Sequence, residues 1–395
     1  MNHVRQLCVS KLMLGLIQHG KACMNITILQ GAFLPVPPLM GGAVEKMWYI
    51  LGHKFVARGH HVTHVSRQWG DLPVSEQIQG VQHIRVAGFD TPGNLLVLKL
   101  LDLVYTLRAI SVIPKQTDII VTNTFWAPIL VPLFYCAKIY VDVARMPKGQ
   151  MRFYGKAQLR SNSTPVADAI RTELSPNLHS QVSMVPNPLP YEVSAAEANA
   201  LADFSNKQRS ILYCGRVHPE KGLELLTMAI NALPEGWQLT IVGPWKISEG
   251  GGGEDYLQSL KAGFDASKVQ FFEPIYDIQQ LNALYKAAAI FVYPSVAEKG
   301  ETFGLAPLEA MAWGAVPVVS DLACFKDFIS HGKNGLIFNH RANDAGEQLM
   351  QCTQRLIDEV TLRNQLAEAA LNVNVSHSPG HIADLFLANF KKILS

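Results

Sequence analysis

The stretch PSVAEKGETFGLAPLEAMAWGAVPVVSD, residues 294–321, decides the class of fold, because it joins two buried strands through a loop and a short helix. The segment that leads into it, AAIFVYPS, is short, apolar and β-branched, which is typical of a buried strand. LEAMAW predicts a compact helix that Gly314 ends, and AVPVVS predicts a second buried strand. This succession of strand, loop, helix and strand indicates a parallel sheet covered by helices.

Two glutamates frame the start of this helix. Glu301 lies in the loop and Glu309 points out of the first helical turn. The N–H groups of Gly304, Leu305 and Ala306 converge between them, and such a helix start is a ready anion site. We interpret the stretch as a site that binds a phosphate through the backbone and hydroxyl groups through the acids. For Glu309 a second interpretation stays open, in which its carboxylate only partners the helix dipole.

The composition places the chain among two-domain α/β proteins. Its 395 residues are many for one core, so two domains are the natural expectation. Charged residues make up 17% and hydrophobic residues 48%, which fits buried parallel sheets. A formal net charge of +2 does not suggest a nucleic-acid binder. Six dispersed cysteines without paired metal-ligand spacing, and no convincing signal peptide, are typical of a reduced cytoplasmic protein.

Strands and helices alternate in two series, which gives the expected domain boundaries. Residues 1–23 are expected outside the fold, 24–190 form the first Rossmann-like domain, and 208–376 form the second. The first series predicts helices at 43–59, 94–110 and 151–163, and strands at 25–31, 61–67, 81–88, 118–124 and 137–145. The proline-rich 181–190 and the polar 191–209 are expected to form the crossover between the domains. The second predicts strands at 210–215, 238–243, 269–274, 290–295, 315–320 and 335–339.

Ligands of such sheets bind at the carboxyl ends of the strands, so we expect a cleft between two facing domains. Besides residues 296–306, three loops after strands carry suitable groups. The first holds Gly41 and Gly42 before a helix, and CGRVHPEKG presents Arg216 and Lys221 as a phosphate clamp. The third is VARMPKGQ, residues 143–150. Neither G-x-G-x-x-G nor G-x-x-x-x-G-K-[ST] occurs, so a nicotinamide, flavin or P-loop enzyme is not supported.

The apolar segment 94–110 is the nearest approach to a membrane element. It is too short and too often interrupted to reach the roughly 18 apolar residues that span a bilayer. Lys99, Asp102 and Arg108 lie near one face at helical spacing, so the segment is amphipathic. The favoured interpretation is a helix packed on a sheet, and attachment to a membrane surface is the alternative.

Taken together, ETFGLAPLEAMAWGAVPVV, CGRVHPEKG and PPLMGG followed by RGHHVTHVS resemble the retaining glycosyltransferases of family 4, which have the two-domain GT-B fold. The resemblance covers nearly all of 24–395 and is densest from 210 to 340. It implies that residues 377–395 form a helix that crosses back to the first domain. The apolar set Ile382, Leu385, Phe386 and Phe390 of that helix recurs at helical spacing.

The resemblance also implies roles for the site residues. Glu301 corresponds to the glutamate at the donor sugar, and Glu309 to the one that binds the nucleotide ribose. Arg216 and Lys221 correspond to the basic pair that neutralises the leaving diphosphate. The backbone of Gly304, Leu305 and Ala306 corresponds to the one that cradles it, and Gly41 with Gly42 to the glycine loop of the first domain. No metal or other cofactor is expected, because these groups supply the positive charge.

Two departures from the family pattern concern histidines. Val121 and Asn123 stand where many members have a D-x-x-H-x-H stretch. Asp142 stands where members often have a histidine that contacts the donor sugar. The aspartate either binds a sugar hydroxyl or assists deprotonation of the acceptor, or the role has been lost or moved.

We therefore expect a metal-independent, retaining hexosyltransferase that moves a sugar from a nucleotide diphosphate to an acceptor hydroxyl. The expected acceptor is a glycan or a lipid-linked glycan in surface or exopolysaccharide assembly, and peripheral membrane contact through the first domain is a further option. The expected location is cytoplasmic, with the inner face of the membrane as a further option. Alternatives are a nucleotide-sugar epimerase or hydrolase of the same fold, and a non-catalytic nucleotide-sugar-binding scaffold subunit.

Overall fold

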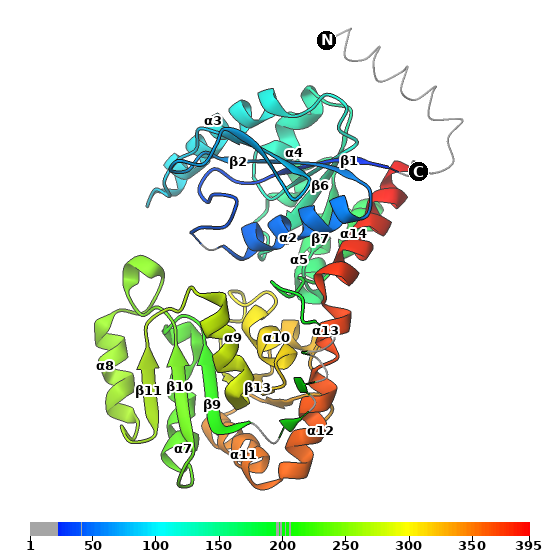
Figure 1. Ribbon diagram of the computed structural model, residues 1–395. Coiled ribbons are helices and arrows are strands. Elements are labelled where there is room, and N and C mark those ends of the chain that lie inside the picture. The colour runs from blue at the N-terminus through cyan, green and yellow to red at the C-terminus, as the bar shows by residue number, and fades with distance from the viewer. Residues whose placement is uncertain (1–22, 41, 195–196, 198–199, 202, 205–206) are drawn as a thin grey trace. The chain divides into compact units, whose positions relative to one another are not determined.

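The computed structural model describes residues 23–40, 42–194, 197, 200–201, 203–204 and 207–395. The chain divides into two compact units (Figure 1). Unit 1 consists of Met1–Tyr191 and Pro379–Ser395, and unit 2 of Glu192–Ser378. The expectation that residues 1–23 lie outside the fold concerns residues that, except for Cys23, are outside the described ranges.

Unit 1 is built on an eight-stranded sheet of order β3-β4-β2-β1-β5-β6-β7-β8, in which only the β3–β4 pair is antiparallel. The strands are β1 (Asn25–Leu29), β2 (His61–Arg67), β3 (Ser75–Ile78), β4 (Val81–Val86), β5 (Ile119–Thr122), β6 (Lys138–Val143), β7 (Gln158–Ser161) and β8 (Val182–Met184). The helices are α2 (Ala43–Ala57), α3 (Leu95–Val112), α4 (Ala127–Leu130), α5 (Thr164–Glu173) and α14 (Pro379–Leu394).

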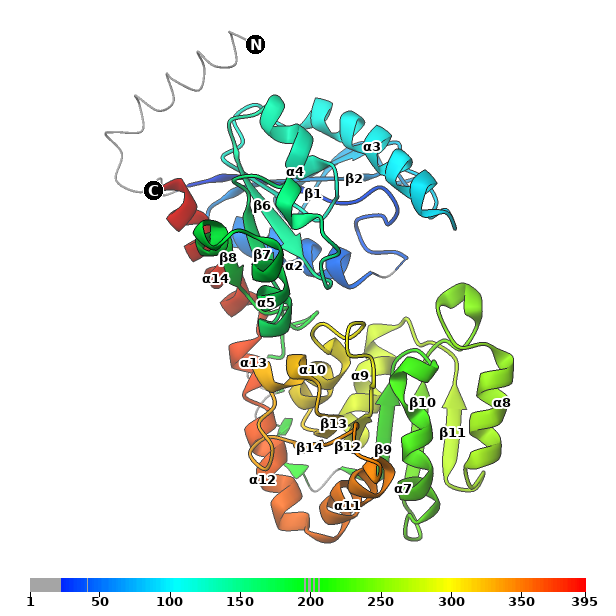
Figure 2. The same ribbon diagram turned by 180° about the vertical axis from the view of Figure 1, so that it is seen from behind.

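Helices cover both faces of this sheet, with α3 and α4 on one side and α2 and α14 on the other (Figures 1 and 2). The apolar residues of α2 recur at helical spacing, so Trp48 and Phe55 turn toward the sheet. On α14, Phe386 and Phe390 are fully buried and lie against these two rings and Tyr140. The last 17 residues of the chain, Pro379–Ser395, therefore complete the core of unit 1.

The helix expected at 151–163 is wrong. Residues Met151–Phe153 form a 3₁₀ turn, and β7 follows as an internal strand between β6 and β8. The letters QLRS do not look like a buried strand, because they include a charge. In the sheet, however, Arg160 of β7 lies directly beside Asp142 of β6, and this ion pair makes burial of both charges tolerable.

Helix α3 packs on the sheet as expected, but its three charged residues do not lie together on one exposed face. Asp102 is buried and accepts hydrogen bonds from the backbone of Phe125 and Trp126, while burial raises its pKa to about 6. Lys99 and Arg108 are exposed. The three charges therefore do not share a polar face. Instead, the exposed surface of α3 is apolar with two cations.

Unit 2 contains a wholly parallel six-stranded sheet of order β11-β10-β9-β12-β13-β14, the strand order of a Rossmann-like domain. The strands are β9 (Gln208–Cys214), β10 (Gln238–Val242), β11 (Val269–Phe272), β12 (Ala288–Tyr293), β13 (Val316–Ser320) and β14 (Leu336–Phe338). The helices are α7 (Thr227–Asn231), α8 (Glu254–Gly263), α9 (Ile278–Ala287), α10 (Leu305–Ala312), α11 (Ala345–Asp358), α12 (Val360–Ala370) and α13 (Val373–Ser376).

Both sheets confirm the expectation of two Rossmann-like parallel-sheet domains. Within the described ranges, no helix has the length and apolar character needed to cross a membrane. The cytoplasmic location stays a prediction.

Candidate functional site

The candidate site lies in unit 2, where loops follow the carboxyl ends of β9 and β12. After β9, a 3₁₀ turn at Pro219–Lys221 begins at His218, whose ring accepts the N–H of Glu220. Gly222 ends this turn with φ 61°, and a Cβ at this position would lie 2.4 Å from the carbonyl oxygen of Pro294. The close approach that glycine permits brings the loop after β9 against the loop after β12. The N–H of Val296 donates to the carbonyl of Glu220 across the same junction.

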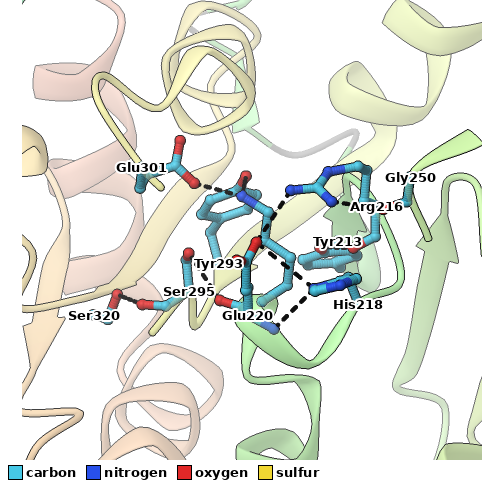
Figure 3. A network of polar contacts seen from close by, with 10 residues as sticks. Tyr213, Arg216, His218, Glu220, Gly250, Tyr293, Ser295, Glu301 and Ser320 are labelled. Carbon is cyan, nitrogen blue, oxygen red and sulfur yellow. Dashed lines mark hydrogen bonds and ion pairs between the residues drawn. The ribbon is translucent and has the colours of Figure 1, made fainter. Parts of the chain in front are cut away.

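Lys221 and Glu301 meet at this junction. The Lys221 Nζ lies 2.6 Å from Oε2 of Glu301 and donates to the Tyr293 hydroxyl at 2.9 Å. Lys221 is only 7% exposed, because the short turn folds its ammonium inward onto the carboxylate of Glu301. Figure 3 shows Tyr293 and Glu301 within the polar network.

Tyr293, the last residue of β12, was not singled out from the sequence. Its ring stacks on Tyr213 with 5.6 Å between centroids, and its hydroxyl lies between Lys221 and Glu301. Burial first, and then the charge of Glu301, raises the pKa of Tyr293 well above its ordinary value. The phenol therefore stays protonated and acts as a fixed hydrogen-bonding group. In the sequence, Tyr293 was recognisable only as the residue that ends a buried strand, directly before Pro294.

The side chain of Arg216 is more exposed than that of Lys221. Its guanidinium donates to the carbonyl of Gly250 at 2.6 Å and to Glu220 at 3.3 Å, and its side chain is 40% exposed (Figure 3). A guanidinium has five N–H donors, so these two contacts leave donors for a ligand. Lys221 likewise uses two of its three ammonium N–H groups in the contacts described above. Counted by donors, each cation thus keeps at least one N–H group beyond these contacts.

The start of α10 is shaped by Gly304, the N-cap residue, with φ 91°. A Cβ there would lie 2.4 Å from Cε1 of Phe325, so this backbone path requires glycine. Leu305 and Ala306 form the first turn, whose N–H groups have no partners within a helix. Glu309 lies in the second turn of α10 and not in the first as expected, because the helix begins at Leu305, and it accepts a hydrogen bond from Tyr285 at 3.2 Å.

Asp142 and Gly42 belong to unit 1, and Gly41 lies outside the described residues. Gly42 is the N-cap residue of α2. Asp142 is 4% exposed, and its two carboxylate oxygens lie 2.6 Å from the Arg160 guanidinium and 2.8 Å from the Trp48 indole nitrogen. These contacts hold α2 on the sheet. A role of Asp142 at the donor sugar stays a prediction.

The structure thus brings Lys221 and Glu301 into direct contact within unit 2, with Arg216 linked to the same turn through Glu220. Cations and the start of a helix can each hold a multiply charged anion, and acids can hold hydroxyl groups. Two Rossmann-like units on one chain define the class of protein as one with the GT-B fold. The cleft expected between the units stays a prediction.

Comparison with known proteins relates unit 2 to a known family. Residues 198–373 match the family model described as "Glycosyl transferases group 1". A phosphatidyl-myo-inositol mannosyltransferase of Mycobacterium leprae is 30% identical over 174 residues, which are 43% of each chain. The chain spans only 31% to 43% of the length of the first curated relatives it matches.

Solved structures agree on the fold across almost the whole chain. A sucrose-phosphate synthase from Thermosynechococcus elongatus has a TM-score of 0.76 and 20% sequence identity, covering 94% of this chain and 99% of its own. The Anabaena protein HepE in complex with UDP has a TM-score of 0.67 and 16% identity, covering 93% and 100%. At these identities the similarity establishes the GT-B fold and leaves the substrate to other arguments.

Proposed function

We propose that the protein is a retaining glycosyltransferase that moves a sugar from a nucleotide diphosphate to an acceptor hydroxyl. The observation that carries the proposal is the ion pair between Lys221 and Glu301, which joins the loops after β9 and β12 within the family-matched segment. The name of the solved HepE complex supports a nucleotide donor, since that protein binds UDP. The proposal includes that the transferred sugar is a hexose.

The chemistry requires charge at the leaving group. Cleavage of the sugar–phosphate bond builds negative charge on the diphosphate, and preorganised cations and backbone donors stabilise it. In the proposal, Arg216 and Lys221 bind the diphosphate oxygens beside the first turn of α10. Glu301 then orients the donor sugar, and Glu309 holds the ribose hydroxyls through charge-assisted hydrogen bonds. No metal is needed in this scheme, because the protein supplies the positive charge.

A nucleotide-sugar screen tests the proposal. We would incubate the protein with UDP-glucose, UDP-N-acetylglucosamine, GDP-mannose and ADP-glucose, with and without glycan acceptors, and follow both binding and turnover. Transfer with retained anomeric configuration, undiminished by chelators, is the expected result. Conversion of UDP-N-acetylglucosamine without an acceptor would favour an epimerase or hydrolase. Binding without turnover under every acceptor would favour the scaffold subunit.

We further propose that the acceptor is a lipid-linked glycan of surface or exopolysaccharide assembly and that unit 1 contacts the cytoplasmic face of the membrane. On α3, Leu95, Leu96 and Leu100 are 76%, 78% and 60% exposed, although a surface helix normally turns leucine inward. The exposed charges of α3 are cations, Lys99 and Arg108, and its one acid is buried. Apolar side chains with basic neighbours fit an anionic lipid surface.

Vesicle flotation tests this membrane contact. The wild-type protein should float with vesicles of phosphatidylcholine and phosphatidylglycerol, and much less with phosphatidylcholine alone. Leu96→Glu should abolish flotation. Val375→Glu is the matched control, because Val375 is 69% exposed on α13 of unit 2. Equal flotation of the Leu96 variant and the control would exclude α3 as the contact.

A further inference from the structure

A charged fork ties together the loops after three neighbouring strands of unit 2. The Arg341 guanidinium binds both carboxylate oxygens of Glu298, with Nε 2.7 Å from Oε1 and NH2 2.8 Å from Oε2. Its NH1 donates to the carbonyl of Asp321 at 3.0 Å. Glu298 follows β12, Asp321 follows β13 and Arg341 follows β14, and these strands are adjacent. We call this the Glu298–Arg341 fork.

The fork has further support on the Glu298 side. The His340 ring nitrogen Nε2 lies 3.0 Å from Oε1 of Glu298, and the His340 side chain is 3% exposed. Asp321 is held in turn by Lys326 at 2.6 Å. The Arg341 and Glu298 side chains themselves are 48% and 50% exposed. A single exposed ion pair contributes little to stability, but a bidentate pair within a network has a defined geometry.

The turn that the fork holds leads directly to Glu301. The N–H groups of Gly300 and Glu301 both donate to the carbonyl of Ala297, at 3.2 and 3.0 Å. Glu298 is the second residue of this turn, so its side chain anchors the turn from outside. On the inner side, Lys221 holds the Glu301 carboxylate. Without the anchor at Glu298, the turn would keep its local backbone bonds and the contact of Glu301 with Lys221, but it would lose its link to the loops after β13 and β14.

We propose that Arg341 and Glu298 are positioning residues, which act through Glu301 by fixing the turn that presents its carboxylate to the donor sugar. This inference rests on the proposed function for its effect on turnover. Its structural part is independent of that function, because it concerns the mobility of residues 298–301 in the unliganded protein. Neither residue touches the donor in this scheme.

Amide hydrogen exchange of the full-length protein tests the structural part. Arg341→Ala should speed the exchange of residues 298–301 by about threefold or more, because a local opening becomes easier. Arg355→Ala is the matched control: Arg355 also pairs with a glutamate, Glu359, and the two side chains are 50% and 52% exposed. The control should leave exchange in the turn unchanged. Both variants should melt within about 3 °C of the wild type.

Turnover of the donor that the wild type uses in the panel above tests the functional part. Arg341→Ala should lower kcat by about tenfold, since misplaced catalytic groups are costly, and Arg341→Lys should restore it only in part. Added to Glu301→Gln, the same change should cost less than about twofold, because the group it positions is already lost.

Unchanged exchange in Arg341→Ala, or an undiminished loss of turnover in the Glu301→Gln background, would overturn the inference. If the wild type uses no donor of the panel, the proposed function fails instead, and the exchange result still decides whether the fork holds the turn.

Discussion

Replacing Lys221 by alanine should destabilise unit 2 as well as slow turnover. The Lys221 ammonium and the Glu301 carboxylate are 9% and 12% exposed as side chains and 2.6 Å apart. Removing the ammonium leaves a nearly buried carboxylate without its counter-charge, and it also removes a donor to Tyr293. Loss of one partner of a buried pair typically costs 3–5 kcal/mol, so we expect about 3 kcal/mol here.

Arg216→Ala provides the contrast. Arg216 and Glu220 are 40% and 51% exposed and 3.3 Å apart, so this loss should be below about 1 kcal/mol. For a unit of this size, 1 kcal/mol corresponds to about 2–4 °C in Tm, which predicts a decrease of roughly 6–12 °C for Lys221→Ala. Both variants should lose about 100-fold or more in kcat, and Arg216→Lys should not restore the full rate.

Thermal and urea denaturation of the unliganded protein measures the difference. The double variant Lys221→Ala, Glu301→Ala should regain more than about half of the lost stability, because it removes the unpaired carboxylate as well. A Lys221→Ala variant as stable as Arg216→Ala would refute the buried-pair reasoning, and so would a double variant less stable than Lys221→Ala. Normal kcat in both single variants would make these residues structural or surface charges only.

Three further predictions concern other parts of the chain. Glu309→Gln should weaken nucleotide binding by about 1–2 kcal/mol in calorimetry, and unchanged affinity would leave Glu309 as a partner of the helix dipole and Tyr285. Truncation at Ser378 should cause aggregation by uncovering the face that Phe386 fills, whereas a soluble and fully active product would contradict this. Burial lowers the pKa of His83 to about 4, so the unfolded chain binds the proton first. Stability should therefore fall as pH drops from about 6.5 to 4, and His83→Gln should flatten that fall.

The sequence predicted most of the fold because parallel strands buried on both faces are recognisable as apolar runs. β12 and β13 are buried throughout, and both were expected from their letters. β7 was missed because its burial depends on an ion pair with a neighbouring strand, which no local pattern contains. The polar face expected on α3 was wrong for a similar reason, because Asp102 is buried and accepts hydrogen bonds from backbone groups distant in sequence.

The sequence also indicated the residues of the candidate site but not their contacts. Lys221 and Glu301 are 80 positions apart, and only the close approach at Gly222 brings their loops together. Glu298 and Arg341 are likewise separated by 43 positions and meet because β12, β13 and β14 are neighbours. Local patterns specify the type of a loop, whereas pairing between loops depends on strand order.

The discontinuous course of unit 1 bears on how the protein is made. The part of unit 1 up to Tyr191 is translated before unit 2, yet α14, which covers Trp48 and Phe55, is translated after unit 2. At typical elongation rates of 5–20 residues per second, the remaining 204 residues (395 − 191) take about 10–40 s. During that interval the nascent unit 1 presents an uncovered apolar face to the cell, where a chaperone can bind it. A stop codon before Pro379 would therefore damage unit 1, although most of unit 1 is translated before unit 2.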